Sequence, residues 1–529
     1  MGSATYSPSS IWQKIEMPVL PPLDSHLTTE VCIVGAGIAG LTTAYQLLRR
    51  GKKVIVLEKN ALGSGETGLT SAHLSSALDD RFKELIQQHG ERGARLAYES
   101  HAAAIDEIER IQAEEGINCE FQRVDGYLFS KEDGKLGELR EELDACRRLG
   151  IEGVHEVSGV PLKTFDSGPA LMFPRQAQFH PLKFLRGLVG AVLRMGGEIY
   201  AHTGVREIDD RVGGVVQTEN GFRIACQSIV MATGVPIQGR FAIHTKEAAY
   251  RSYIVVLEVE SDLMKPCLLW DTEEPYHYVR LENDEQTGRT YLIVGGEDHK
   301  TGQDALPAQH FANLQDWIYD RLGIEGRSVG QWSGQIVEPV DSLAFIGRHP
   351  SLGENVYMIS GDSGHGLTHG VLGSLILSDL IMGEENEWTS LYDPSRKSWT
   401  GLGAYLSENT NVAAQYMDWM SLGDVASESE IPPGEGAVIR SGLKKMAVYR
   451  DQEGTLHRLS ATCPHLGGIV RWNSAEKTWD CPCHGSRFDS RGTVLNGPAV
   501  SPLEAEETSE ETGERETNAA KIDLLHPPS

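Results

Sequence analysis

Short apolar runs and a helical repeat alternate near the start of the chain. The apolar run Val31–Val34 is followed by a helical pattern over Leu41–Arg50 and then by a second apolar run, Val54–Leu57. Apolar runs of about four residues, bounded by glycine, are typical of strands that are buried on both faces. This order predicts a strand–helix–strand unit, with the helix ending at Gly51.

Further along, helical and strand-like patterns are mixed. The predicted elements are helices over Arg95–Glu115, Gly137–Leu149, Val371–Met382 and Lys397–Met420, and strands over Ile229–Thr233, Tyr253–Val259 and Tyr276–Leu281. The segment Ser421–Gly436 is rich in serine and glutamate, holds two prolines, and is typical of a linker. Short runs between glycines after it predict a small β-sandwich.

A glycine-rich motif joins the first strand to the first helix. Gly35, Gly37 and Gly40 form the pattern GxGxxG, and Glu58 ends the second strand, 18 residues after Gly40. In this context Gly35 permits a tight turn, Gly37 lets backbone approach a pyrophosphate, and Gly40 allows close helix–strand packing. The helix N-terminus favours phosphate charge, and Glu58 would accept from a ribose hydroxyl. The motif predicts a bound dinucleotide; the alternative is a chance glycine turn.

Three further segments distinguish FAD from NAD. Ile229–Gly234 is a strand that ends in a Thr-Gly turn, Gly63–Ala72 is a loop rich in glycine and hydroxyl groups, and Gly361–Gly370 precedes a helix. With Gln178–Val205 and Phe345–Pro350, these segments resemble the D-amino-acid oxidase/glycine oxidase superfamily over roughly residues 28 to 395. The resemblance implies FAD, and it assigns to FAD binding the residues Gly35, Gly37, Gly40, Glu58, Lys59, Thr67, Ser71, Val205, Thr233, Gly234, Gly361, Gly364, Gly366, Leu367 and Thr368.

A second motif lies near the other end of the chain. Cys463-Pro-His465 is followed, after 15 intervening residues, by Cys481-Pro-Cys-His484. Two thiolates and two imidazoles are the ligands of a Rieske-type [2Fe–2S] cluster. A zinc site is the alternative, although zinc fingers place Cys with Cys and His with His. The words CPHLGG, WDCPCHGSRFD and NGPA resemble the Rieske family, and the resemblance assigns Cys463 and Cys481 to one iron and His465 and His484 to the other.

Two departures from the respiratory-type Rieske pattern are visible. That pattern adds a cysteine to each loop and joins the two in a disulfide. Here Cys483 is present, but Gly468 occupies the position of the other cysteine, so the bridge cannot form. Ser486 is kept, whereas Phe488 occupies the position of a tyrosine whose hydroxyl bonds the cluster. Fewer hydrogen bonds to the sulfurs lower the reduction potential, so we expect a mid-range or low value.

These resemblances imply an α/β Rossmann-type FAD-binding fold with an interleaved α+β substrate domain containing a mixed sheet, and a small all-β Rieske domain. The expected division is an N-terminal extension on the surface (1–27), the FAD-binding domain (28–80, 175–240 and 335–395), the substrate domain (81–174 and 241–334), a helical segment and linker (396–430), the Rieske domain (431–503) and an acidic tail (504–529). The 529 residues leave room for about three domains.

Charge and composition exclude several classes of protein. The chain has 75 acidic and 48 basic residues and a net charge of −27, which argues against nucleic acid or an anionic membrane as a partner. Eight cysteines in a chain of this length do not make a disulfide framework. No charge-free apolar stretch is long enough to span a membrane, and no secretion signal is apparent, so we expect a cytoplasmic protein.

The expected substrate pocket centres on one strand. The alternation of a strand places Tyr276, Tyr278 and Arg280 on one face and His277 on the other. This pattern is typical of a strand that lines a pocket, and equally of an ordinary half-buried strand. In amino-acid oxidases an arginine that clamps the substrate carboxylate follows the position of Trp332, but Gln335–Glu338 holds no arginine. Arg280 is a possible substitute. The departure makes a free α-amino acid doubtful and favours a secondary amine or another activated C–H donor.

Two histidines complete the candidate site. His365, in the glycine loop, either polarises the substrate or packs on the ring edge. His73 is a weaker candidate for a covalent flavin link, since its offset from Glu58 matches poorly. The predicted catalytic set is therefore Tyr276, Tyr278, Arg280 and His365.

The leading hypothesis is an FAD-dependent dehydrogenase or oxidase for a small amine. Its electrons would leave FAD singly through the Rieske cluster to an external acceptor protein, because a flavin converts between two-electron and one-electron carriers. The alternatives are an electron-transfer component that feeds a partner oxygenase or reductase, and a redox-sensing flavoprotein. A Rieske oxygenase is disfavoured, because no clear set of two histidines and a carboxylate for a mononuclear iron stands out.

Overall fold

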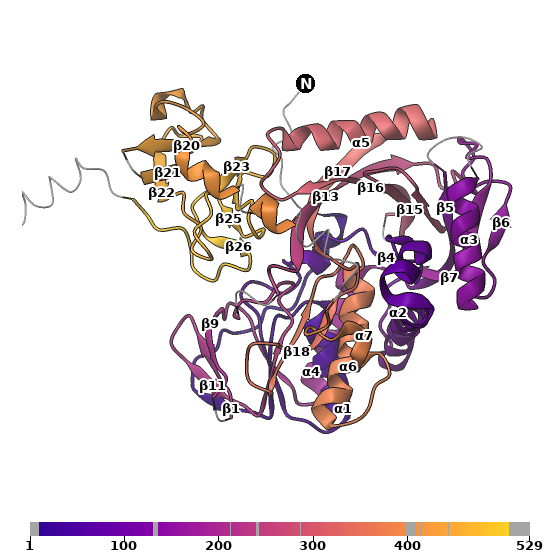
Figure 1. Cartoon of the computed structure of the whole chain (residues 1–529), viewed down its shortest axis with the longest axis horizontal. Helices are drawn as coiled ribbons and strands as arrows, with labels where there is room; N and C mark the ends of the chain where they lie inside the picture. Colours follow the sequence, from indigo (N-terminus) through magenta and orange to yellow (C-terminus); the bar gives the residue numbers. More distant parts are fainter. Residues whose placement is uncertain are drawn as a thin grey trace, which may run out of the picture. The chain divides into compact units, whose positions relative to one another are not determined.

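The computed structural model describes residues 10–130, 136–211, 213–239, 243–285, 287–397, 408–412, 415–442 and 444–506. The chain divides into two compact units, Met1–Thr410 and Asn411–Ser529 (Figure 1). This boundary lies within the predicted helical segment and linker, residues 396–430.

A six-stranded sheet in the first unit carries the predicted strand–helix–strand motif. Its order is β18–β19–β12–β2–β3–β8, and the strands are β18 (Phe345–Arg348), β19 (Val356–Ser360), β12 (Ser228–Met231), β2 (Val31–Val34), β3 (Val54–Leu57) and β8 (Glu198–Tyr200). All neighbours pair in parallel except β18, which runs antiparallel at one edge. The central strands β2 and β3 are buried throughout, as their unbroken apolar sequences require. The predictions for both strands are confirmed.

Helices α1 (Ile38–Arg49), α4 (Pro181–Arg194) and α6 (Gly366–Met382) belong to this layer, and α1 packs on both of the others. A Cβ at Gly370 would stand 3.1 Å from Ile38 Cγ2 and 3.2 Å from Ala39 Cβ, so glycine lets α1 and α6 approach closely. Helix α6 begins at Gly366, earlier than the predicted Val371, because the glycine loop itself supplies the first helical turn.

A nine-stranded mixed sheet forms the second layer of this unit. Along its main path the strands are β17 (Arg327–Pro339), β13 (Glu247–Val259), β16 (Arg289–Lys300), β15 (His277–Asp284), β14 (Cys267–Asp271), β5 (Gln122–Phe129), β7 (Ala170–Gln178) and β4 (His73–Leu74), with β6 (His155–Val157) paired to β7. Only β14 and β5 pair in parallel among these neighbours. Strands β7 and β17 run across the predicted domain boundaries at 175 and 335. The predicted combination of a Rossmann-type layer with a mixed sheet is confirmed.

Further helices accompany this sheet. Helix α5 (Pro307–Leu322) packs on β13 and β16 (Figure 1), while α2 (Arg81–Glu115) packs on α3 (Gly137–Leu149) and α6. Helix α2 begins at Arg81 rather than at the predicted Arg95, and it bends at Gly90, whose φ of +71° no regular helix contains. A glycine tolerates that angle, so two helical stretches join into one element. Helix α3 has the predicted bounds.

Smaller elements complete the first unit. A four-stranded sheet consists of β1 (Leu27–Thr28), β11 (Arg223–Ala225), β10 (Val215–Thr218) and β9 (Val205–Asp209), and the short helices are η1 (Ile11–Lys14), η2 (Glu66–Gly68) and α7 (Thr389–Tyr392). The expectation that residues 1–27 lie on the surface is wrong for Trp12, which is buried and meets the His180 ring edge-on at 5.1 Å. The free energy gained by burying a large aromatic ring outweighs the conformational entropy lost when the polar segment around it is fixed.

The described part of the second unit contains two small β-sheets, short 3₁₀ turns and a few α-helical residues at its start. One sheet holds β20 (Glu435–Ser441), β21 (Lys444–Arg450) and β22 (Leu456–Ser460), and the other holds β23 (Arg471–Asn473), β24 (Thr478–Asp480), β25 (Arg487–Asp489) and β26 (Val494–Asn496). Val438, Trp479 and Phe488 lie in its core. Half of the predicted helix over Lys397–Met420 lies outside the described residues; residues 408–412 and 415 are helical as predicted, and its last part is the 3₁₀ turn η3 (Tyr416–Met420). The predicted linker contains a second such turn, η4 (Glu428–Glu430), and the start of β20.

Among the residues that the structure describes, no helix combines the length and the apolar character needed to cross a bilayer. Most of the predicted acidic tail, beyond residue 506, lies outside them.

Candidate flavin and iron–sulfur sites

The glycines of the first motif lie at the carboxyl ends of β2, β3 and β12. Gly35 has a φ of +105°, and a Cβ there would stand 2.3 Å from the carbonyl oxygen of Ala232. A Cβ at Gly40 would stand 1.9 Å from the Gly35 carbonyl oxygen. Both approaches are closer than any side chain permits, so these two positions require glycine. The backbone is thereby folded tightly at the switch point where open α/β sheets bind ligands.

The start of α1 has the features of a diphosphate cradle. Ile38 N donates to Thr67 Oγ1 at 3.1 Å, and a Cβ at Gly37 would stand 3.2 Å from the same hydroxyl oxygen. Glu58 Oε2 accepts from Ala36 N at 2.9 Å, and burial raises the pKa of this carboxyl. A helix N-terminus lined by backbone N–H groups favours a phosphate, and a carboxylate at the end of β3 suits a ribose hydroxyl. The residues present therefore fit FAD.

The remaining predicted cofactor residues of this part of the chain lie in several separate elements. Gly234 has a φ of +77°, and its carbonyl accepts from Ser360 Oγ at 3.2 Å, which ties the turn after β12 to β19. Val205 is buried at the start of β9, and burial lowers the pKa of Lys59. Ser71 Oγ lies 3.0 Å from His73 Nδ1, and Thr233 is half-buried. Their contacts with FAD stay a prediction.

The glycine loop before α6 lies against residues from the start of α2. His365 N donates to the Asp362 carbonyl at 2.7 Å, and both Gly361 and Gly364 have positive φ angles. A Cβ at Gly364 would stand 2.6 Å from Asp79 Oδ2 and 3.3 Å from the Tyr276 hydroxyl. At the first turn of the helix, Thr368 Oγ1 lies 2.8 Å from His101 Nδ1. Glycine therefore allows the loop, Asp79 and Tyr276 to meet.

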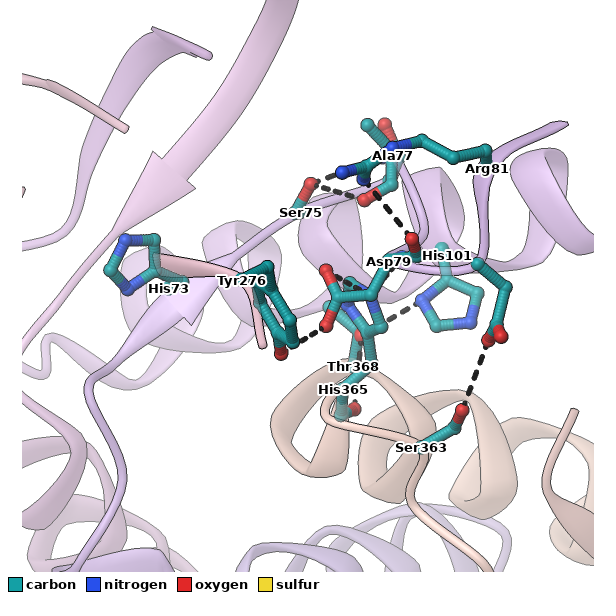
Figure 2. Close-up of polar contacts among 12 residues, drawn as sticks. His73, Ser75, Ala77, Asp79, Arg81, His101, Tyr276, Ser363, His365 and Thr368 are labelled. Atoms are coloured by element: carbon teal, nitrogen blue, oxygen red, sulfur yellow. Dashed lines mark hydrogen bonds and ion pairs between the residues drawn. The ribbon is translucent and has the colours of Figure 1, made fainter. Parts of the chain in front are cut away.

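Asp79 is the centre of a polar cluster with Tyr276 and His365 (Figure 2). The Tyr276 hydroxyl donates to Asp79 Oδ2 at 2.8 Å, and His365 Nε2 lies 3.3 Å from Asp79 Oδ1. Burial raises the pKa of Asp79, but the charge and hydrogen bond of His365, with the Tyr276 hydroxyl, more than offset it and lower the pKa. Burial and the Asp79 charge raise the pKa of Tyr276 well above its usual value, so this hydroxyl stays a donor.

The state of His365 follows from two contacts at one atom. Its Nε2 is 3.1 Å from Asp79 N, a donor, and 3.3 Å from Asp79 Oδ1, an acceptor. The first contact needs an unprotonated nitrogen and the second a protonated one. Burial lowers the pKa of His365, but the charges of Asp79, Asp80 and Asp362 outweigh it, so the pKa is raised. We therefore assign the proton to Nε2 below that pKa, where His365 and Asp79 form an ion pair.

More carboxyl groups, which the sequence did not reveal, accompany this cluster. Ser363 Oγ donates to Glu338 Oε2 at 2.8 Å and lies 3.3 Å from Asp80 Oδ2. Burial raises the pKa of Asp80 to about 6 and that of Asp362 to about 7, and burial together with the Asp80 charge raises the pKa of Glu338 well above its usual value. The Asp79–Asp80 pair before α2 was the available signal, but the sequence does not show which distant residues meet it.

The proposed role of Arg280 as a carboxylate clamp is wrong. Arg280 is fully buried, and its Nη1 donates to the Ala72 carbonyl at 2.9 Å and to the Phe179 carbonyl at 3.4 Å. Its Nη2 forms an ion pair with Glu282, and its guanidinium faces the Trp12 ring at 5.5 Å. A cation taken out of water must find partners within the fold, and here they occupy the donors a substrate would need.

The predicted strand alternation around Arg280 is confirmed. His277 turns to the α5 side, where its ring stacks on Trp317 at 4.2 Å and its Nδ1 lies 3.0 Å from Asp271 Oδ2. On the other side, the Tyr278 hydroxyl lies 2.9 Å from Ser252 Oγ. Trp332 Nε1 donates to the Leu69 carbonyl at 2.7 Å, so this indole is held by the loop after η2. Roles for Tyr276, Tyr278 and His365 in catalysis stay predictions.

His73 does not gain support as a covalent attachment point. It lies in β4 with its Nδ1 3.0 Å from Ser71 Oγ and its ring edge-on to Tyr278 at 5.4 Å. Burial lowers the pKa of His73 to about 3.

In the second unit, two loops bring the predicted metal ligands together. Cys463 and Cys481 are buried, and their thiols are close enough to interact, which raises the pKa of Cys463 well above its usual value. The rings of His465 and His484 meet edge-on, with centroids 5.0 Å apart, and burial lowers the pKa of His484 to about 4, the neutral state a metal ligand needs. The residues therefore fit a cluster held by two sulfurs and two nitrogens.

Backbone hydrogen bonds hold each loop in shape. Gly467 N donates to the Cys463 carbonyl at 3.0 Å, and Gly485 N donates to the Cys481 carbonyl at 3.1 Å. Ala499 N donates to Ser486 Oγ at 3.0 Å, which connects the second loop to the segment after β26. Phe488, at the position of the missing tyrosine, is buried in the core.

The position of Gly468 agrees with the predicted absence of a bridge. All eight cysteines lie in the described part of the chain and are free. A Cβ at Gly468 would stand 2.6 Å from Cys483 Sγ and 3.2 Å from Cys481 Sγ. The first loop therefore passes Cys483 at the distance of a disulfide but has no sulfur to offer.

Residues of η3 lie over the first of these loops. The Tyr416 hydroxyl donates to the Leu466 carbonyl at 2.8 Å, and Trp419 Nε1 donates to the Gly467 carbonyl at 3.0 Å. Arg471 Nη2 pairs with Asp418 Oδ2 at 2.7 Å and anchors the turn to β23. The segment before the predicted Rieske boundary at 431 thus contributes to the environment of the ligands.

Comparison with known proteins gives matches to both units. The family model described as FAD dependent oxidoreductase matches residues 30–380, and the Rieske [2Fe-2S] domain model matches residues 421–507. The Bacillus subtilis (strain 168) protein YhfW, described as a Rieske 2Fe-2S iron-sulfur protein, is 32% identical over 504 residues, which cover 94% of this chain and 98% of that relative.

Two further relatives match the first unit. The gamma-glutamylputrescine oxidoreductase of Escherichia coli (strain K12) is 23% identical over 382 residues, covering 68% of this chain and 85% of the enzyme. The crystal structure of glycine oxidase from Geobacillus kaustophilus aligns with a TM-score of 0.60 at 19% identity, covering 70% of this chain and 99% of that one. The structural likeness shows a shared fold.

Proposed function

This chain belongs to the FAD dependent oxidoreductase family and carries a Rieske [2Fe-2S] domain, and on that premise we propose that it oxidises a small amine and delivers the electrons singly to an external acceptor protein. The observation that carries the proposal is the presence of both ligand sets in one chain, the glycine cradle at α1 and the paired Cys–His loops. When bound, FAD takes two electrons from an organic donor and a Rieske cluster carries one at a time, which makes the pair a converter.

The charges around Asp79 support an amine as the donor. Asp79 carries a lowered pKa, and Asp80 and Glu338 lie within contact of Ser363 beside it. A cationic substrate is attracted by such a group, whereas a free carboxylate would be repelled and would lack the usual arginine, since Arg280 is engaged by Glu282. The relatives named above act, by their names, on gamma-glutamylputrescine and on glycine, both of which contain an amine.

The residues of the cluster have defined tasks in this proposal. An amine is oxidised in its neutral form, so an arriving ammonium group must lose a proton. Asp79, which its lowered pKa keeps ionised, attracts and orients the incoming group and water takes the proton, while the Tyr276 hydroxyl and His365 Nε2 hold the carboxylate in place. The raised pKa of Tyr276 ensures that it orients and does not itself take the proton.

The test is an anaerobic absorbance screen with the purified holoprotein. Small primary and secondary amines are added, and the flavin and cluster bands are followed together. We expect an amine to bleach the flavin first and the cluster afterwards, and an added one-electron acceptor to restore both. A Cys463→Ser variant should lose cluster bands while its flavin is still bleached by the amine. A cluster that stays oxidised while the flavin turns over with oxygen would refute the electron route.

A further inference from the structure

A group of two histidines and one aspartate lies between β16 and α5, apart from the Asp79 cluster. One ligand atom each from His299, Asp304 and His310 lies within 4.8 Å of the other two. The three residues are half-buried, and the side chains of Asp304 and His310 keep 26% and 17% of their exposure, so an ion has access from solvent. The first lies near the end of β16, the second in the connection, and the third in the first turns of α5.

Local structure sets the direction of two of these ligands. Leu306 N donates to Asp304 Oδ1 at 2.9 Å, which fixes the carboxylate and turns Oδ2 toward His310 Nε2, with which it forms an ion pair. The rings of His299 and His310 are 4.5 Å apart between centroids. The two rings are stacked, with an interplanar angle of 7°, so one of them must turn before both can direct a nitrogen to the same ion.

Glu297 supports His310 from behind. Its Oε2 accepts from His310 Nδ1 at 3.1 Å and from Asn313 Nδ2 at 2.7 Å. A carboxylate that accepts from Nδ1 is the arrangement found behind metal-bound histidines, and an ion at Nε2 would take the place of the proton that Nε2 shares with Asp304. Glu297 has a φ of +57°, a conformation that a non-glycine residue adopts only where the surrounding contacts hold it.

We propose that His299, Asp304 and His310 bind a divalent transition-metal ion, with zinc as the best-matched ion. Two imidazoles and one carboxylate, a set that the sequence did not reveal, are a recurrent ligand set for such ions, and water would complete the coordination. The site lies on the α5 side of the nine-stranded sheet, where His277 packs on Trp317, whereas Tyr276 contacts Asp79 on the other side. The ion therefore has a structural task, tying the end of β16 to the start of α5, and does not depend on the proposed amine oxidation.

Charge favours a cation at this position. Glu297 and Asp304 contribute two carboxylates to the contacts of His310. Arg251 is the cross-strand partner of His299, and its Nη2 donates to Ser333 Oγ. The competing interpretation is a network in which a proton, not a metal, sits between His310 and the two carboxylates. The two interpretations differ in what they predict for added zinc.

The experiment uses the full-length holoprotein, freed of loosely bound metal with a chelator, and zinc chloride as the probe. We expect one zinc ion per chain beyond the cluster iron, with an X-ray absorption shell of nitrogen and oxygen at about 2.0–2.2 Å and no sulfur, which binds at about 2.3 Å. His299→Asn and Asp304→Asn should each abolish this binding. Glu297→Gln, which removes only the supporting acceptor, should weaken it about 10–100-fold.

A matched control is available in the other unit. His457 Nε2 pairs with Asp451 Oδ2 at 3.0 Å, so His457→Asn removes a histidine from a comparable His–Asp contact and should leave zinc binding unchanged. Because a ligand variant can fail to fold, the absorption spectrum of the unaltered holoprotein stands as an independent test. A sulfur shell, absence of stoichiometric zinc, or equal binding by His299→Asn would overturn the proposal in favour of the proton network or thiol binding.

Discussion

Gly468 offers a sharp test of how the iron–sulfur loops are built. A Cβ at this position would stand 2.6 Å from Cys483 Sγ, so Gly468→Ser forces a side chain into occupied space and should destabilise the unit by about 1–3 kcal/mol. Gly468→Cys makes the same approach but can convert it into a disulfide. The two introduced side chains are nearly equal in size, yet under oxidising conditions serine should lower the unfolding free energy of the unit and cysteine should raise it.

The magnitude follows from the loop that the new bond would close. Residues 468 and 483 are separated by 15 positions (483 − 468), and closing a loop of that size constrains the unfolded chain by about 3 kcal/mol before strain is subtracted. With a guanidinium dependence of roughly 2–6 kcal/mol per molar, oxidised Gly468→Cys should unfold at a midpoint about 0.5–1.5 M higher than its reduced form.

The assay is loss of the cluster absorbance in guanidinium, followed with and without a thiol reductant. Mass spectrometry with a thiol label counts free cysteines and shows whether the bond has formed. The double variant Gly468→Cys/Cys483→Ser has the added side chain but no partner, so its midpoint should not respond to reductant. If Gly468→Cys keeps both thiols free in air, or if oxidation leaves the midpoint unchanged, the loop geometry described above is incorrect.

Three further predictions concern the first unit. Gly40→Ala should abolish retention of FAD on purification, because its Cβ would stand 1.9 Å from the Gly35 carbonyl oxygen; absorbance at the flavin bands measures this, and full retention would contradict the close packing. Tyr276→Phe should cost about 1.5–3 kcal/mol of unfolding free energy, because the hydroxyl donates at 2.8 Å to the half-buried carboxylate of Asp79; denaturant unfolding checks it, and a loss below 0.5 kcal/mol would refute it. Asp79→Asn should lower the pKa of His365 by removing the anion that raises it. Because a raised folded-state pKa gives stability that is present at low pH and lost as pH rises through that pKa, the variant should lack this loss in a pH series of unfolding curves.

The sequence determined those features whose physics is local. A glycine that must adopt a φ of +105°, as at Gly35, is required by the turn itself, so the motif could be read without knowing its neighbours. The ligand pairs Cys463–His465 and Cys481–His484 are likewise held within single loops by short backbone hydrogen bonds. Apolar runs such as Val31–Val34 predicted buried strands, because burial on both faces leaves no place for a polar residue.

What the tertiary structure decided is which distant groups share a buried space. Arg280 lies on the predicted face of its strand, but only the fold shows Glu282 and the carbonyls of Ala72 and Phe179 around its guanidinium. Asp79 meets Tyr276 and His365 only because three separate elements converge. The charge of a buried group depends on every neighbour within a few ångströms, and chain order does not determine those neighbours, whereas backbone sterics and strand periodicity act between residues adjacent in sequence.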